Sequence, residues 1–407
     1  MKEASSYVCA HCMRGDVILR EWVDRNGAKG NCSYCGMNRY STLPVSQVAN
    51  YVLDQIKSDY EPYAPSHNGL FEETIYLGTG NILADVLDYR GDIEGMSHYE
   101  LIGNLCATID ALISPQTAWK LRSQDGHGTE LRYSWTSFVG EIKYRRRFLF
   151  LSADKSKNGR FLPKHSAEEI MKIIGDALVK LNLIDELKAG EKIYRARRAR
   201  NGEVFNGKEQ LGAPSPKRAT AERMNPPGIP YFYAAFDRLT ACAEVCGDKL
   251  EPLNTVYVST WEVKKQLKVV DLSRLGVLPS YFDPKKRISR SPHLFLRDFI
   301  RDACSPRPED DTAQLTYIPA QVMSEYFRTV LQVDGVIFTS TKNRDGRCVV
   351  IFPDDDDDDT IETGLFDNKL KLCDQTEKKL VGIEPDLIIP RVVVDDLDNP
   401  WEVSSYR

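Results

Sequence analysis

The sequence predicts an α+β protein in which a small cysteine-bearing module and a helical segment precede a mixed α/β domain. Three observations predict this class: two CxxC pairs near the N-terminus, apolar residues at helical spacing from about 45 to 151, and short strands interleaved with short helices after 166. At 407 residues, the chain is long enough for two or three domains that each bury a core. We expect the boundaries at 1–44, 45–165 and 166–407.

Composition excludes several classes of protein. Hydrophobic content of 42% and charged content of 28% are ordinary for a globular chain. A net charge of -5 gives no overall electrostatic reason to expect nucleic acid or an anionic membrane as a partner. The sequence has no apolar run of about 18 residues and no apolar signal-peptide core at its start. We therefore expect a cytoplasmic protein with no membrane partner.

The N-terminal module carries two CxxC pairs, Cys9-Ala-His-Cys12 and Cys32-Ser-Tyr-Cys35. Four thiolates at this spacing can close tetrahedrally on a structural Zn²⁺, leaving no open position for chemistry. Residues 17–23 between the pairs are expected to form a strand, as in a zinc ribbon. The alternatives are reduced structural cysteines and, less favoured, a redox pair; His11 is expected to be a bystander.

Three helices are expected in the segment that follows. Val48, Val52 and Ile56 recur at a 3.6-residue period, and further helical runs are expected over 99–113 and 135–151. The arginine run 145–147 is expected to be a solvated face.

The last domain is expected to start with a helix capped by the box Ser166-Ala-Glu-Glu169. Strands are expected near 190–197, 229–235, 255–261, 267–272, 335–340 and 348–352, and a helix from Tyr317. We expect an irregular excursion over 275–312, a solvated loop at the six aspartates 354–359, and last strands near 387–395. The order is α+β, and no GxGxxG or P-loop is present.

One local motif brings several polar residues together. Asn225-Pro-Pro-Gly228 must be a loop, because two prolines remove donors and glycine permits positive φ. An aromatic strand carrying Tyr233 follows, and Asp237 is a plausible N-cap of the next helix. Leu239 and Ala243 are expected on that helix's buried face, beside Glu244. A carboxylate is rarely buried without a partner, so this motif predicts a functional site.

Five sequence blocks of the last domain together carry a family resemblance. They are Ile193-Tyr-Arg195-Ala-Arg, Arg223-Met-Asn225-Pro-Pro-Gly, Tyr233-Ala-Ala with Glu244 beyond it, Tyr317-Ile-Pro-Ala-Gln321, and Asp334-Gly-Val-Ile-Phe-Thr-Ser340. On these blocks residues 190–355 resemble a RES domain. The cysteines and helices ahead of them resemble the HEPN-like region found fused before RES domains.

The resemblance implies an ADP-ribosyltransferase-like fold and a toxin that consumes NAD⁺ as its substrate. Cleavage of the nicotinamide–ribose bond would be a glycohydrolase, phosphorylase or ADP-ribosyltransferase reaction, and the partner would be an antitoxin or regulatory protein. The residues it implies are Arg195, Tyr233, Glu244 and Ser340 as catalytic groups, with Arg195, Arg223, Asn225, Tyr233 and Ser340 binding NAD⁺. Tyr231 is the rival of Tyr233.

The chemistry of the implied reaction explains these residue types. Cleavage passes through an oxocarbenium-like state, which a carboxylate such as Glu244 stabilises. Forked guanidinium groups of Arg195 and Arg223 can grip a pyrophosphate. Glu222 and Met224 stand where the family often has glycine and an aromatic residue, so this loop departs from the pattern.

Two other readings remain open. The first is a zinc-ribbon and HEPN protein that binds nucleic acid or cleaves RNA and carries an inactive RES-like domain; the second is a catalytically dead protein–protein module. HEPN ribonucleases carry an Arg-x4–6-His pair on a helix, and Arg122–His127 and Arg160–His165 have that spacing. Each pair contains a helix breaker, so neither is expected to be a helical catalytic pair.

Overall fold

The structure is a computed structural model. It describes residues 6–63, 78–87, 96–113, 118–121, 128–148, 166–199, 203–246, 255–304, 313–343, 345–354 and 364–374. The chain divides into two compact units. The N-terminal unit holds the described residues up to Tyr133 together with Val277–Phe295, and the C-terminal unit holds Ser134–Gly276 and the described residues from Leu296 onward. The three segment boundaries expected from the sequence remain a prediction.

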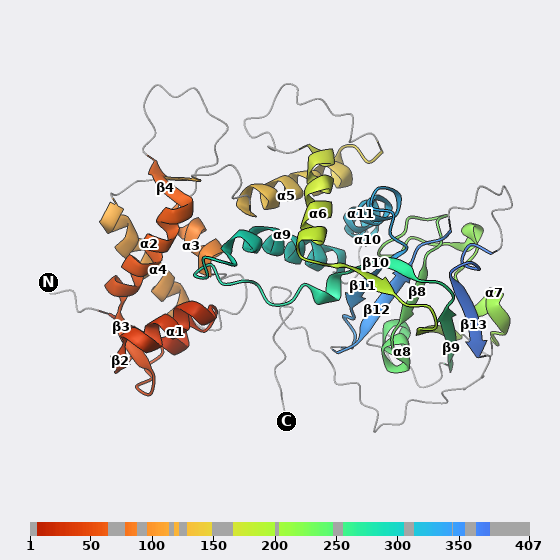
Figure 1. The fold of residues 1–407 in the computed structure, drawn as a ribbon, viewed down its shortest axis with the longest axis horizontal. Helices are drawn as coiled ribbons and strands as arrows, with labels where there is room; N and C mark the ends of the chain where they lie inside the picture. Colours follow the sequence, from red (N-terminus) through yellow and green to blue (C-terminus); the bar gives the residue numbers. More distant parts are fainter. Residues whose placement is uncertain are drawn as a thin grey trace. The chain divides into compact units, whose positions relative to one another are not determined.

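The N-terminal unit combines helices with two small antiparallel sheets (Figure 1). Strands β1, β3 and β2 form one sheet in that order, and β4 pairs with β5 in the other. Its elements are β1 (Tyr7–Cys9), a 3₁₀ turn (Ala10–Met13), α1 (Val17–Asn26), β2 (Ala28–Lys29), β3 (Ser41–Pro44), α2 (Val45–Asp59), β4 (Tyr60–Tyr63), α3 (Thr79–Leu87), α4 (Met96–Ile113) and β5 (Ala118–Leu121).

The strand expected over 17–23 is wrong, because this segment is helix α1. Asp16 caps the helix, since its Oδ1 accepts a hydrogen bond from the backbone N of Leu19 at 3.0 Å. Leu19 and Val23, four residues apart, are both buried. A helical period of apolar residues behind a capping aspartate thus overrides the β-propensity of Val17 and Ile18.

Helices α2 and α4 confirm two of the three expected helical runs. Val48, Val52 and Ile56 are fully buried along one face of α2, and Leu101, Leu105 and Ile109 along one face of α4. The third helix, α5 (Gly128–Tyr144), ends earlier than expected. Arg145–Arg147 beyond it are exposed as expected, and Glu141 pairs with Arg145 and Arg146.

The expectation of an irregular excursion over 275–312 is also wrong, because its described part contains helix α9 (Arg287–Cys304). The short α10 (Ala313–Thr316) follows directly after the segment. The beginning of this segment completes the core of the N-terminal unit: Tyr281 and Phe282 are buried there. The Phe282 ring stacks on Tyr51 at 5.6 Å, and Tyr51 stacks on Trp22 at 4.1 Å. Charged residues interrupt the apolar pattern of this segment in the sequence. The sequence therefore did not indicate that Tyr281 and Phe282 are core residues.

The C-terminal unit is built on an eight-stranded mixed sheet with the order β13-β9-β7-β8-β12-β11-β10-β6 (Figure 1). Only the β10–β11 pair is parallel within this sheet as described, so the predicted α+β class is confirmed. The strands are β6 (Ile184–Leu187), β7 (Lys192–Ala199), β8 (Phe232–Ala235), β9 (Thr255–Val263), β10 (Leu267–Asp271), β11 (Gly335–Thr339), β12 (Arg347–Ile351) and β13 (Leu370–Asp374).

The helices of this unit include α6 (Ala167–Lys180), α7 (Gly207–Leu211), α8 (Arg238–Cys246) and α11 (Ile318–Thr329). The expected capping box is present, because Ser166 and Glu169 bond reciprocally at the start of α6. Helix α8 packs against β7, β8 and β9, and α11 packs against α6 and β11. The last strands expected near 387–395 lie outside the described residues, and so do residues 355–359 of the expected aspartate loop. Strand β13 was not predicted.

Candidate active site and metal centre

The loop before β8 is closed by its own hydrogen bonds. Gly228 adopts a φ of +86°, and its N donates to the carbonyl of Ala219 at 2.9 Å. Asn225 is buried, and its Nδ2 donates to the carbonyls of Thr220 and Pro226 at 3.0 and 3.1 Å. Gln321 on α11 donates to the carbonyl of Asn225 at 3.0 Å. Asn225 therefore shapes the loop from within, a role its sequence position alone did not reveal.

Tyr233 in the middle of β8 points its hydroxyl at this loop. The hydroxyl donates to Oδ1 of Asn225 at 2.8 Å and accepts from the backbone N of Met224 at 3.1 Å. Burial raises the pKa of Tyr233 above its ordinary value, so the side chain is neutral. Its rival Tyr231 lies in the core, with its ring 4.8 Å from that of Phe352.

Arg195 comes from β7, the neighbouring strand. Its Nη1 donates to the backbone carbonyl of Tyr233 at 2.7 Å, and its guanidinium carbon lies 5.3 Å from the centre of the Phe232 ring. Side chains alternate along a strand, so Phe232 and Tyr233 point to opposite faces. Arg195 is thus joined to Tyr233 through the backbone. Burial, with a smaller effect of Arg197, lowers the pKa of Arg195 to about 10. Its Nε is buried and has no hydrogen-bond partner among the residues that the structure describes.

Glu244 lies on α8, which Asp237 caps as expected: Oδ1 of Asp237 accepts from the backbone N of Thr240 at 2.7 Å. The buried face of the helix differs by one residue from the expected one, because Leu239 is 45% exposed while Thr240 and Ala243 are buried. Glu244 is half-buried beside this face.

The carboxylate of Glu244 has two partners, and both come from the β11–β12 hairpin. Oε1 accepts from the hydroxyl of Ser340 at 2.5 Å and from the thiol of Cys348 at 3.5 Å. Burial, then the charge of Glu244, raises the pKa of Cys348 well above its usual range, so the thiol keeps its proton. Ser340 and Glu244, ninety-six positions apart, are directly bonded.

Arg223, on the loop before β8, acts electrostatically on both Tyr233 and the cluster around Glu244. Its guanidinium carbon lies 5.7 Å from the centre of the Phe338 ring, and Phe338 is the cross-strand partner of Cys348. Although burial dominates both shifts, the charge of Arg223 acts against them, favouring a lower pKa at Tyr233 and at Cys348. The loop thus brings a cation within electrostatic range of the tyrosine and of the Glu244 cluster.

Three contributors to this region were not expected as site residues. Cys348 read as part of an apolar strand, Thr240 as one more helix residue, and Asn343 as a turn residue. Their hydrogen bonds to one another and to Glu244 or Ser340 depend on strand pairing and on packing of α8. The Thr-Lys-Asn sequence after Ser340 is the one signal that could have indicated a side chain–backbone turn.

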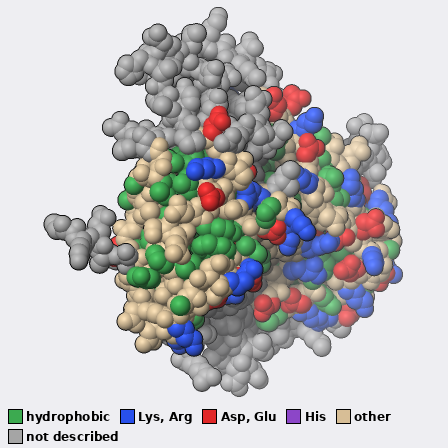
Figure 2. Space-filling model, turned by 60° about the vertical axis from the view of Figure 1, so that its left-hand side comes forward, with side chains coloured by type: hydrophobic (Ala, Val, Ile, Leu, Met, Phe, Trp, Pro, Cys, Tyr) green, Lys and Arg blue, Asp and Glu red, His purple; other side chains and the backbone are tan. Residues whose placement is uncertain are grey.

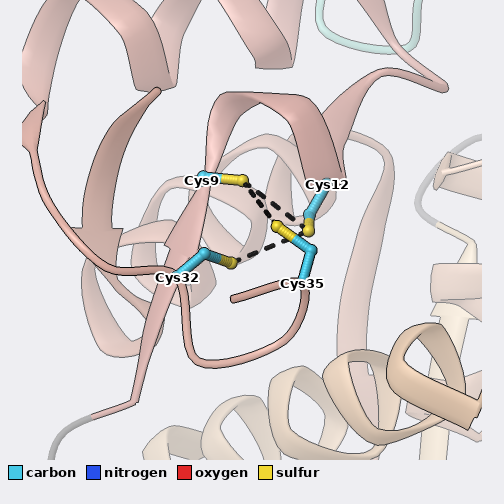
Figure 3. Close-up of side chains that lie close together, drawn as sticks. All are labelled: Cys9, Cys12, Cys32 and Cys35. Atoms are coloured by element: carbon cyan, nitrogen blue, oxygen red, sulfur yellow. Dashed lines mark hydrogen bonds between the residues drawn. The ribbon is translucent and has the colours of Figure 1, made fainter. Parts of the chain in front are cut away.

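The four cysteines of the N-terminal unit form a second cluster (Figure 3). Their sulfur atoms point toward one another and all lie within 4.8 Å. Cys9 Sγ lies 3.5 Å from that of Cys35 and 3.7 Å from that of Cys12, and Cys12 and Cys32 are also 3.7 Å apart. A Zn–S bond of about 2.3 Å in a tetrahedron separates sulfurs by about 3.8 Å, so the cluster fits a zinc ion.

His11 lies beside this cluster without joining it. Its ring stacks on Tyr40 at 5.0 Å, and its Nε2 lies 3.2 Å from Nη1 of Arg14. The group that could hold a metal ion is therefore the four cysteines, which converge as the sequence predicted, and zinc binding stays a prediction. The helix α1 between the two pairs is the feature that departs from the expected ribbon.

On the face seen in Figure 2, positive and negative side chains of the described residues are interspersed. This face therefore shows no large patch of one charge among those residues. None of the helices in the described part of the chain is long and apolar enough to span a bilayer. Both Arg-x4–6-His pairs lie outside the described residues.

Two family models match parts of the chain. Residues 192–369 match the family model described as RES domain, and residues 25–156 match that described as HEPN/RES N-terminal domain 1. No curated protein matches the chain. A solved structure, the crystal structure of the M. tuberculosis MbcT–MbcA toxin–antitoxin complex, is similar at 14% identity and a TM-score of 0.27, covering 50% of this chain and 90% of that one.

Proposed function

The chain belongs to the RES-domain family and carries the N-terminal domain named for its association with RES, and on that premise we propose that it is an enzyme that consumes NAD⁺ by cleaving the nicotinamide–ribose bond. The observation that carries the proposal is the bond between Ser340 and Glu244. This hydrogen bond fixes the orientation of the half-buried Glu244 carboxylate. A carboxylate held in a fixed orientation can stabilise the positive charge of an oxocarbenium-like transition state.

Each of the other predicted residues has a role under this proposal. Arg195 holds a buried N–H that no group of the described residues accepts, as expected of a group that binds an anion such as pyrophosphate. Arg223 supplies a second cation on a loop held by Asn225. Tyr233, neutral and fixed by its hydroxyl, offers a ring face to the nicotinamide or ribose.

The acceptor is water, phosphate or a protein side chain, and the products distinguish them. With water, the product is ADP-ribose; with phosphate, it is ADP-ribose 1″-phosphate; with a protein, ADP-ribose becomes attached to it. We expect Glu244 to stabilise the developing charge in all three cases, or to orient the acceptor.

The test follows nicotinamide release from NAD⁺ by the purified full chain, with and without phosphate or added protein. We expect turnover by the unaltered chain and a loss of about 100-fold or more in Glu244→Gln, the size of effect seen when one transition-state contact is removed. Glu209→Gln, an exposed glutamate on α7, is the matched control and should keep full activity. Intact NAD⁺ under every acceptor, or full activity in Glu244→Gln, overturns the proposal.

We also propose that the protein acts as a toxin restrained by an antitoxin or other regulatory protein, as its family implies. Induced expression should deplete cellular NAD⁺ and arrest growth, and the Glu244→Gln variant should do neither. Growth arrest that persists in Glu244→Gln would separate toxicity from NAD⁺ cleavage and refute this part.

For the N-terminal unit we propose a structural Zn²⁺ held by Cys9, Cys12, Cys32 and Cys35. The sulfur spacing and burial of three of the four cysteines support it. The ion would complete its shell with protein sulfur and therefore supply stability rather than catalysis. Elemental analysis of the purified chain should find one zinc per molecule; protein that is folded and free of metal contradicts it.

A further inference from the structure

The turn between β11 and β12 is fastened to the start of α8 through Thr240. This residue is fully buried. Its hydroxyl donates to Oδ2 of Asp237 at 2.6 Å and accepts from Nδ2 of Asn343 at 2.7 Å. The threonine thus connects the cap of a helix with a residue of the hairpin turn.

Asn343 continues this connection to Ser340. The backbone N atoms of Asn343 and Lys342 donate to the Ser340 hydroxyl at 2.9 and 3.1 Å. With both acceptor positions of that oxygen occupied, its single proton is directed to Glu244, 2.5 Å away. A continuous series of hydrogen bonds therefore runs from Asp237 through Thr240, Asn343 and Ser340 to Glu244.

The backbone of the turn lies close against Thr240. A Cβ added to Gly346 would fall 2.1 Å from Oγ1 and 2.7 Å from Cγ2 of Thr240. The carbonyl of Gly346 accepts from the backbone N of Ser340 at 2.9 Å. Contact and hydrogen bonding thus hold the turn at one distance from α8, the helix that carries Glu244.

We infer that Thr240 is a positioning residue for the proposed reaction: its hydroxyl, together with Asn343, holds the β11–β12 turn so that Ser340 aims its hydrogen bond at Glu244. Thr240 lies one helical turn before Glu244 and is fully buried, so it would act through the turn rather than directly on a substrate. The effect on turnover rests on the proposed function, whereas the effect on the geometry of the turn does not.

The experiment compares Thr240→Val, which keeps the shape of the side chain but loses the hydroxyl, with Thr240→Ser, which keeps the hydroxyl. Amide hydrogen exchange of Lys342 and Asn343 in the full chain reports the turn, and kcat and KM for NAD⁺ report the site. We expect protection of the two amides to fall about tenfold in Thr240→Val, the equivalent of one lost hydrogen bond. We expect kcat to fall about tenfold with little change in KM, and Thr240→Ser to resemble the unaltered chain.

Asn343→Ala provides a second route if Thr240→Val fails to fold, because it removes the other end of the same bond from a half-buried turn position. It should reproduce the loss of protection. Unchanged protection of Lys342 and Asn343 in either folded variant overturns the inference. If the unaltered chain leaves NAD⁺ intact, the proposed function fails, and the exchange measurement still decides the role of Thr240.

Discussion

The cysteine cluster and the Glu244 cluster are assembled in opposite ways. All four cysteines lie within residues 9–35, and two short knuckles bring their sulfur atoms within 4.8 Å. The Glu244 cluster joins a helix residue to Ser340, in the turn after β11, and to Cys348 on β12, both about a hundred positions further along the chain. Ligand spacing therefore sets the geometry of the first cluster, whereas strand register and helix packing set that of the second.

The variant with the largest expected effect removes one cysteine. Cys32→Ser should reduce the zinc content from one ion per chain to none and unfold the N-terminal unit, because structural zinc supplies about 10 kcal/mol or more of apparent binding free energy. Ser340→Ala, the matched change in the Glu244 cluster, should cost only about 1 kcal/mol. Elemental analysis and circular dichroism of both variants measure this; a Cys32→Ser protein with bound zinc and native helix content argues against the metal centre.

A second prediction concerns the part of the N-terminal unit that is not local. Phe282→Ala should lower the free energy of unfolding of this unit by about 3–5 kcal/mol, because the buried ring stacks on Tyr51 within the core. The urea midpoint for zinc release, read with a zinc-sensitive dye, should fall accordingly. Val277→Ala, in the same segment but 92% exposed, is the control and should leave the midpoint unchanged. Equal midpoints for the two variants would mean that the unit does not need this segment.

A third prediction separates binding from stability at Arg195. Since burial lowers its pKa to about 10, the folded state penalises the charged form. The ordinary pKa of arginine is higher still, so this cost is fully present at neutral pH and is relieved only as the pH rises through about 10. Arg195→Met removes this cost, so the free energy of unfolding should stay unchanged or rise by up to about 2 kcal/mol. The same variant should abolish NAD⁺ turnover, because it removes the cation proposed to bind the pyrophosphate. Urea titration measures it, and a loss above about 2 kcal/mol would show that Arg195 is chiefly structural.

The smallest expected effect concerns Cys348. Burial raises its pKa, so the folded state penalises the thiolate, and this residue should lower stability only as the pH rises above its ordinary pKa of about 8.5. At pH 8 the native chain should react with iodoacetamide at the exposed Cys373 and hardly at all at Cys348. Peptide mass spectrometry, with urea-unfolded protein as the control, measures both rates. Rapid labelling of Cys348 in the folded chain contradicts its burial beside Glu244.

The sequence by itself was sufficient where the signal is local. The CxxC pairs predicted four converging thiols, the apolar period predicted α2 and α4, and Ser166 and Glu169 predicted a capping box that is present. Each of these depends on residues within a few turns of one another. The β-propensity of residues 17–23 led to a wrong prediction of a strand. The segment is a helix because Asp16 caps it and because Leu19 and Val23, four residues apart, are both buried.

Only the tertiary structure decided what meets across the chain. It placed Tyr281 and Phe282 in the core of the N-terminal unit, bonded Ser340 to Glu244, and joined Arg195 to the backbone of Tyr233 rather than to its side chain. The physical reason is that these contacts follow from strand pairing and helix packing, which depend on the summed burial of many residues and leave no short motif. The sequence determined which residue types carry the chemistry, and the pairing of β8, β12 and β11 decided which of them touch.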